Sequence, residues 1–214
     1  MRIVQSDQYA RLGDVGELIF DTYLENGVAT IELDSRASNE WLYWINPTNW
    51  FDEDQGSRWL IGLSKEIPTD LDLELGTGAA GINLQDLTLT ALAVDGSTGG
   101  MDLALPGGNY PIILETGTGG STIILPDTGQ LDFEVNSGTG SLTFLLPKSM
   151  EMMVVVKDKG TGALHFDDNL FSKSAGGDDG EGTWTTSNYK EGAKNSIELI
   201  LDSGTGSVSF DSKP

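Results

Sequence analysis

The chain has 214 residues, of which 33 are acidic and 12 basic, giving a formal net charge of −21. A surface this acidic repels phosphate backbones and anionic lipid, so we expect neither a nucleic-acid partner nor docking on acidic membranes. The lack of Cys excludes disulfides and thiol catalysis. The sequence has no uninterrupted apolar run of about 18 residues, so no membrane-spanning helix is predicted.

The first 66 residues differ from the rest of the chain because they hold four of its five Trp. Within them, GVATIELDS (27–35) alternates like a β-strand, so coils of the repeat described below could begin there, whereas INPTNWFDEDQG (45–56) has the composition of a loop. The first twenty residues lack the apolar core of a signal peptide, so no signal or anchor is predicted from them. The four Trp are Trp41, Trp44, Trp50 and Trp59.

From residue 67 onward the chain repeats a Gly-Thr-Gly motif in steps of about 21 residues. A variant, DGSTGG, lies at 95–100, and one double step separates the last two motifs. The motifs begin at Gly76, Gly117, Gly138, Gly160 and Gly204.

Apolar residues alternate with polar ones on both sides of each motif, which is the pattern of a β-strand with one buried face. A strand, a corner and a second strand in each step predict an all-β, single-stranded β-solenoid over residues 67–214. We expect like residues to stack in buried columns, for example Leu103, Ile123 and Phe144. Because the coil exceeds the 18 residues of left-handed hexapeptide helices, a right-handed β-helix-like stack is favoured.

The glycines are predicted to form the corner of each coil, where little side-chain bulk fits and a positive φ could be needed. A second corner follows at a fixed offset and carries Pro106, Pro126 and Pro147. A solenoid must cover its open end, and the Trp-rich residues 1–66 are predicted to form that cap.

Between Phe166 and the last repeat lies a Gly-, Asp- and Ser-rich segment, predicted as a long acidic loop at about 167–196 that could contain one degenerate coil. Its carboxylates could converge on Ca²⁺, but their spacing matches no known calcium loop, so a solvated loop is favoured. These carboxylates belong to Asp167, Asp168, Asp178, Asp179 and Glu181.

No residue pattern predicts a catalytic, metal or cofactor site. His165 is the only His, and a Ser-His-Asp arrangement with Asp167 is formally open, but the sequence has no nucleophile elbow, so a surface His on a strand is favoured. Alternating acids such as Asp132 with Glu134, or Asp72 with Glu74, could serve glycoside hydrolysis, but a solvated strand face explains them more simply.

Two further readings concern ligand surfaces. The Thr of each motif forms one column, as in ice-binding solenoids, yet it lies at a corner without a flat Thr-x-Thr face. The cluster WLYWINPTNWF (41–51) could stack on sugars, although core or cap packing is the favoured reading.

The coils "L-x-L-x-x-G-T-G" with a following "L-x-L-P" resemble bacterial toast-rack domains over about residues 67–214. These domains are relatives of adhesin-like proteins and of the C-terminal domain of cell-wall-active antibiotic response proteins. The resemblance implies a stack of β-coils, a cell-envelope or extracellular role, a protein or carbohydrate partner, and no enzyme.

We therefore expect a non-enzymatic scaffold or adhesin-like recognition protein of the bacterial envelope. The first alternative is a polysaccharide-active β-helix enzyme, although such lyases use an Arg or Lys base and residues 67–214 contain no Arg. The second is a self-assembling structural solenoid. Against it, the C-terminal SVSFDSKP ends in charge and Pro, which blunt a strand edge.

Overall fold

The computed structural model describes residues 18–25, 28–35, 61–96, 98–176 and 180–213, with side chains from residue 61 onward. In these ranges every regular element is a β-strand, which confirms the all-β class. None of the described residues form a helix long and apolar enough to cross a membrane. The chain divides into two compact units, Met1–Ser64 and Lys65–Pro214, and each is described by itself.

In the first unit, β1 (Leu18–Glu25) and β2 (Val28–Ser35) pair as an antiparallel hairpin, with Glu25 opposite Val28. The strand predicted in GVATIELDS is therefore present. β2 pairs with β1 in a two-stranded sheet of their own, so these two strands form a hairpin and not part of a parallel stack. The four Trp lie in residues 36–60, outside the described residues, and the cap role of residues 1–66 stays a prediction.

The second unit consists of two sheets, and successive strands alternate between them from β3 to β12 and again from β15 to β16. The eight-stranded sheet contains β3 (Thr69–Glu74), β5 (Leu89–Asp95), β7 (Gly108–Glu115), β9 (Gly129–Ser137), β11 (Glu151–Asp158), β13 (Phe171–Ala175), β14 (Gly182–Thr186) and β15 (Ser196–Ser203). The six-stranded sheet contains β4 (Ala80–Asn83), β6 (Met101–Ala104), β8 (Ser121–Ile124), β10 (Leu142–Leu146), β12 (Leu164–Phe166) and β16 (Val208–Ser212).

The strands of neighbouring coils pair in parallel and in register, so equivalent residues stack. Leu103 pairs with Ile123 and Ile123 with Phe144, and the exposed fractions of the three are 1%, 0% and 0%. The predicted column is therefore confirmed. A second interior column in the other sheet runs Leu71, Leu92, Ile112, Phe133, Leu199, Val154. Burial of these columns between the two sheets is the main source of stability.

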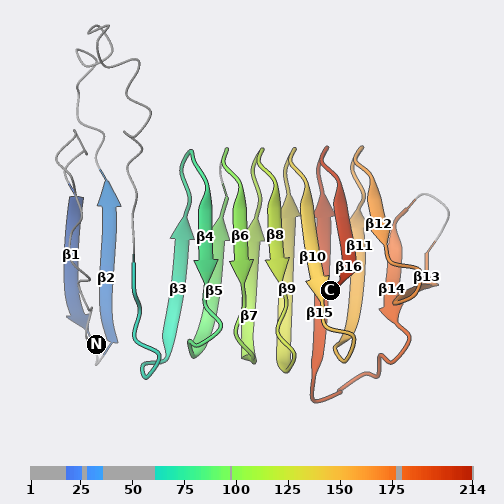
Figure 1. Ribbon diagram of the computed structural model, residues 1–214, viewed down its shortest axis with the longest axis horizontal. Helices are drawn as coiled ribbons and strands as arrows, with labels where there is room; N and C mark the ends of the chain where they lie inside the picture. Colours follow the sequence, from blue (N-terminus) through green and yellow to red (C-terminus); the bar gives the residue numbers. More distant parts are fainter. Residues whose placement is uncertain (1–17, 26–27, 36–60, 97, 177–179, 214) are drawn as a thin grey trace, which may run out of the picture. The chain divides into compact units, whose positions relative to one another are not determined.

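The order of the coils in space differs from their order in the sequence. The last coil, β15 and β16, lies between the coil of β9 and β10 and the coil of β11 and β12, as Figure 1 shows. Leu199 pairs with Phe133 on one side and with Val154 on the other. The argument that SVSFDSKP blunts the end of the stack is therefore wrong, since this segment lies inside the stack.

The predicted acidic loop at 167–196 contains a β-hairpin instead. In it, β13 and β14 pair antiparallel, and β14 also pairs antiparallel with β11, so the segment is not a degenerate parallel coil. Trp184 on β14 stacks on Phe166, with ring centroids 4.7 Å apart, and Phe171 on β13 packs against Phe166 and Phe210. These aromatic side chains cover the interior column at this end of the stack.

The corner glycines are required by close backbone approach more than by unusual φ. A Cβ on Gly140 would overlap the carbonyl oxygen of Gly119, and a Cβ on Gly138 would overlap those of Thr116 and Gly117. At the described motifs a positive φ occurs only at Gly78 (128°) and Gly160 (60°). The prediction that glycine is needed for a positive φ therefore holds only at these two positions. Backbone stacked on backbone at the strand spacing leaves no room for a side chain.

Candidate functional site

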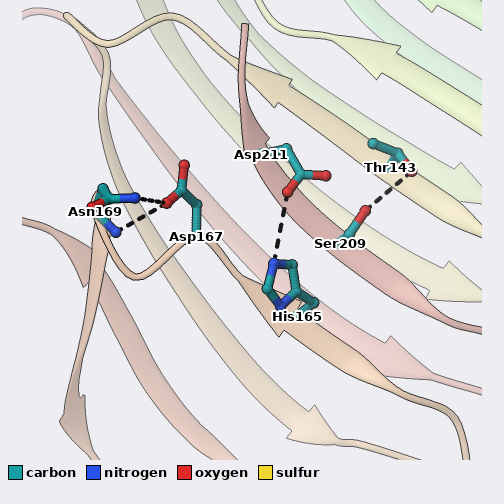
Figure 2. Close-up of polar contacts among 6 residues, drawn as sticks. All are labelled: Thr143, His165, Asp167, Asn169, Ser209 and Asp211. Atoms are coloured by element: carbon teal, nitrogen blue, oxygen red, sulfur yellow. Dashed lines mark hydrogen bonds and ion pairs between the residues drawn. The ribbon is translucent and has the colours of Figure 1, made fainter.

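His165 lies on β12, on the outer face of the six-stranded sheet. Its side chain is 68% exposed, and its Nε2 lies 3.9 Å from Oδ1 of Asp211 on β16 (Figure 2). This confirms the reading of His165 as a surface residue on a strand. The contact is an exposed ion pair when the imidazole is protonated, and such pairs add little to stability.

The predicted triad partner Asp167 turns to another residue. Its Oδ1 accepts hydrogen bonds from the backbone N–H and the side-chain amide of Asn169, both at 2.9 Å (Figure 2). These two bonds are the main reason that the pKa of Asp167 is lowered; burial opposes them, and the charges of His165 and Lys148 add smaller lowering effects.

Ser209 is the register partner of His165 on the neighbouring strand, but its hydroxyl donates to Oγ1 of Thr143 at 3.1 Å. The structure therefore brings His, Ser and Asp side chains onto one face without the base-to-nucleophile hydrogen bond of a hydrolase. This geometry does not match an acyl-transfer site of that kind.

The alternating acids are outward, exposed residues of the eight-stranded sheet, as predicted. Asp132 and Glu134 project from β9, and Asp72 and Glu74 from β3, each on the solvent side of an interior column. Within the described residues, no three His, Cys, Asp or Glu side chains lie close enough together to hold a metal ion. Asp178 and Asp179 of the acidic insert lie outside those residues.

Sequence reasoning missed that these acids form a ladder across the sheet. Each coil contributes a residue at or next to the end of its strand, just before the corner, and the pairing places these residues side by side. The signal was visible in the sequence, because an acid precedes four of the five Gly-Thr-Gly motifs by two positions. The ladder runs Glu74, Asp95, Glu115, Asn136, Asp202, Asp158.

Two large apolar residues on the same face were also missed. Ile113 on β7 is 48% exposed and Ile200 on β15 is 38% exposed, and each pairs with Glu134, which lies between them on β9. Exposed apolar residues that lie close together on one surface indicate an interaction site, whereas single scattered ones do not.

The family model described as "N-terminal domain of toast_rack, DUF2154" matches residues 22–124. This part of the chain belongs to the toast-rack family. The resemblance expected over residues 67–214 thus coincides with the match over 67–124, and the match also reaches back into the first unit. The later coils continue the register of the toast-rack coils strand by strand.

No curated protein matches the chain. Among solved structures, the chain is similar to a crystal structure of a "putative cell adhesion protein" from Clostridium sporogenes. The two are 18% identical, with a TM-score of 0.48, and the similarity covers 92% of this chain and 77% of the other. Similarity at this level does not by itself establish a common fold.

Proposed function

We propose that this toast-rack protein is a non-enzymatic protein of the bacterial cell envelope or surface, serving as a scaffold or an adhesin-like recognition module. The match to the toast-rack family supports the location in the cell envelope. The recognition role is supported by one observation. The outer face of the eight-stranded sheet is a continuous row of exposed side chains held in register by five parallel strands, β3, β5, β7, β9 and β15. A broad, rigid face of this kind suits a macromolecular partner.

Surface labelling of the host cell tests the location. Intact cells are treated with a membrane-impermeant amine reagent, which has seven Lys to modify in residues 67–214. The protein should be labelled in intact cells, and it should remain in the envelope fraction after lysis. Labelling only after lysis, together with recovery in the soluble cytoplasmic fraction, would contradict the proposal.

The absence of enzymatic activity is tested separately. Purified protein is incubated with a panel of acidic polysaccharides, with and without Ca²⁺, and unsaturated products are followed by ultraviolet absorbance. The proposal expects no turnover above that of a heat-denatured sample. Turnover that depends on His165 or on the paired acids would favour the polysaccharide-active enzyme instead.

Two finer features of the fold belong to the same proposal. The coils are proposed to wind right-handed, the rule for parallel crossovers. Residues 1–66 are proposed to cap the solenoid, because β3 and β4 are edge strands of the second unit and the leucines of β3 are only half-buried. A fragment beginning at residue 61 should then aggregate at concentrations where the full chain stays monomeric in light scattering. Equal behaviour of the two would exclude the cap.

A further inference from the structure

The outer face of the eight-stranded sheet is chemically unlike the opposite face of the stack. Five consecutive strands of this sheet, β15, β9, β7, β5 and the edge strand β3, contain no Lys or Arg. They project nine exposed acids into solvent, and within the described residues none of the nine forms an ion pair with a cationic side chain. The nine are Asp70, Asp72, Glu74, Asp95, Glu115, Asp132, Glu134, Glu198 and Asp202. We call this surface the acidic face.

The six-stranded sheet provides a natural comparison within the same molecule. Its outward residues on β6, β8, β10 and β16 include only two acids, Asp102 and Asp211, beside hydroxyl and aliphatic side chains. Asp211 lies next to His165. Between the outward faces of the two sheets, the acids are therefore concentrated on the eight-stranded one, although solubility alone would be served equally well by an even distribution.

The acidic face also carries apolar residues at its centre. Ile113 and Ile200 lie in one row with Glu134 between them, and the half-buried Val155 of β11 continues the row. The ladder that ends in Asp158 lies one outward position from this row, on the side of the corners. On the other side, Asp132 and Glu198 lie next to each other, beside Pro111. The outward side chains are regularly spaced, with about 4.8 Å between strands and about 6.6 Å between successive outward residues on one strand.

We propose that the acidic face docks a protein partner that presents Lys or Arg side chains around an exposed aliphatic cluster. The proposal rests on the recognition role given above and names the surface and the partner's chemistry. Charge complementarity selects a cationic partner, and the isoleucines supply apolar area that the partner can bury. A protein is favoured over a cationic polysaccharide, because the outward positions of the five strands carry no aromatic ring on which a sugar could stack.

The inserted coil completes this face. Glu198, Ile200 and Asp202 all belong to β15, which lies between β9 and β11 only because the last coil enters the stack there. If the coils stacked in sequence order, β11 would follow β9, and its Met153 and Val155 would take the places of Glu198 and Ile200. The partner surface thus depends on the topology and not on composition alone.

The test uses the purified full chain and fluorescently labelled peptides of about nine residues in anisotropy titrations. One peptide alternates Lys with Ile and Thr, a second has every Ile replaced by Thr, and a third has every Lys replaced by Glu. A glucosamine oligomer of similar charge stands for a cationic polysaccharide. The Lys–Ile peptide should bind most tightly, and its affinity should fall as salt is raised. The Glu peptide should not bind.

Matched variants assign the binding to one face. Glu115→Gln with Glu134→Gln should weaken the Lys–Ile peptide about three- to tenfold, an effect expected for two exposed charge pairs. Asp102→Asn with Asp211→Asn changes the charge equally on the opposite face and should alter the affinity less than about twofold. Ile113→Thr with Ile200→Thr should abolish the preference for the Lys–Ile peptide over the Lys–Thr peptide. All these substitutions are at solvent-facing positions, and thermal melts verify that the fold is retained.

Three results would overturn the proposal. The two double substitutions of acids could weaken binding of the Lys–Ile peptide equally, the isoleucine variant could keep its preference for that peptide, or no peptide could bind at all. Tighter binding of the glucosamine oligomer than of the Lys–Ile peptide would replace the protein partner by a cationic polysaccharide. Failure here is distinguishable from failure of the proposed function. If the host's envelope fraction binds wild type and the Glu115→Gln, Glu134→Gln variant equally, recognition stands and the acidic face is the wrong surface.

Discussion

Phe210 stacks face to face on Phe144, with ring centroids 5.0 Å apart and planes 7° apart. Phe166 then stacks on the other face of Phe210 at 4.7 Å and 3°. Phe210, which comes last of the three in the sequence, is thus the middle ring. The last coil of the chain therefore lies between two coils that precede it in the sequence. Parallel stacking at the strand spacing explains the ring separations.

Removing the middle ring should cost more than reshaping it. Phe210→Ala is expected to lower the free energy of unfolding by about 3–5 kcal/mol, because it leaves a cavity between two rings that cannot close together. Phe210→Leu nearly conserves volume and should cost less than about 1.5 kcal/mol. Urea titrations followed by circular dichroism measure both. Comparable stability of the alanine variant and wild type would show that residue 210 is not in the column.

The corner glycines should be sensitive to a single methyl group wherever a neighbouring coil lies against them. Gly138→Ala places a Cβ against the carbonyl oxygens of Thr116 and Gly117 and should destabilise by roughly 1–3 kcal/mol. Gly76→Ala is the matched control, since a Cβ at this first corner meets nothing within 4 Å. Thermal unfolding compares the two. A Gly76→Ala variant that melts as early as Gly138→Ala would contradict close approach as the reason for glycine.

The carboxyl of Asp167 should titrate below its usual range, because it accepts two hydrogen bonds from Asn169. Since the folded-state pKa is depressed, the stabilisation is present above the ordinary Asp pKa and is lost as pH falls through the lowered value. Asn169→Ala removes the side-chain donor and keeps the backbone donor, so it should restore the pKa only in part. Carboxyl chemical shifts recorded by NMR between pH 2 and 6 follow this. An unchanged pKa in the variant would mean that the amide contact is absent in solution.

How far the sequence could predict the fold depends on the residues concerned. The columns through Leu103, Ile123 and Phe144 follow directly from period-two alternation. The members Val154 and Val156 were missed because a bulge at Lys157 inserts one residue before the corner, which moves the pattern by one position. The insertion of the last coil was not predictable, since every coil offers the same register to either neighbour.

The hairpin and the acidic face illustrate two other limits. Gly, Asp and Ser dominate the segment of β13 and β14, which is loop composition, and only Phe171 and Trp184 pointed to a packed structure there. The face, in contrast, was within reach of the sequence. Asp132 and Glu134 were recognised as outward residues, but the gathering of acids on one sheet with Ile113 and Ile200 required the strand order.

The position of the last coil underlies both the strand order and the acidic face. The chain has no Cys, so introduced Cys pairs can be oxidised without interference. Thr143 and Ser209 lie on adjacent strands, with side-chain oxygens 3.1 Å apart, whereas Thr143 and His165 are separated by β16, about 9.6 Å at the strand spacing. Disulfide formation in Thr143→Cys, Ser209→Cys is compared with that in Thr143→Cys, His165→Cys by non-reducing electrophoresis. The account predicts rapid oxidation within the first pair and none within the second, whose separation exceeds disulfide reach. Oxidation of the second pair and not the first would mean that the coils stack in sequence order, and both the inserted coil and the acidic face built on it would be wrong.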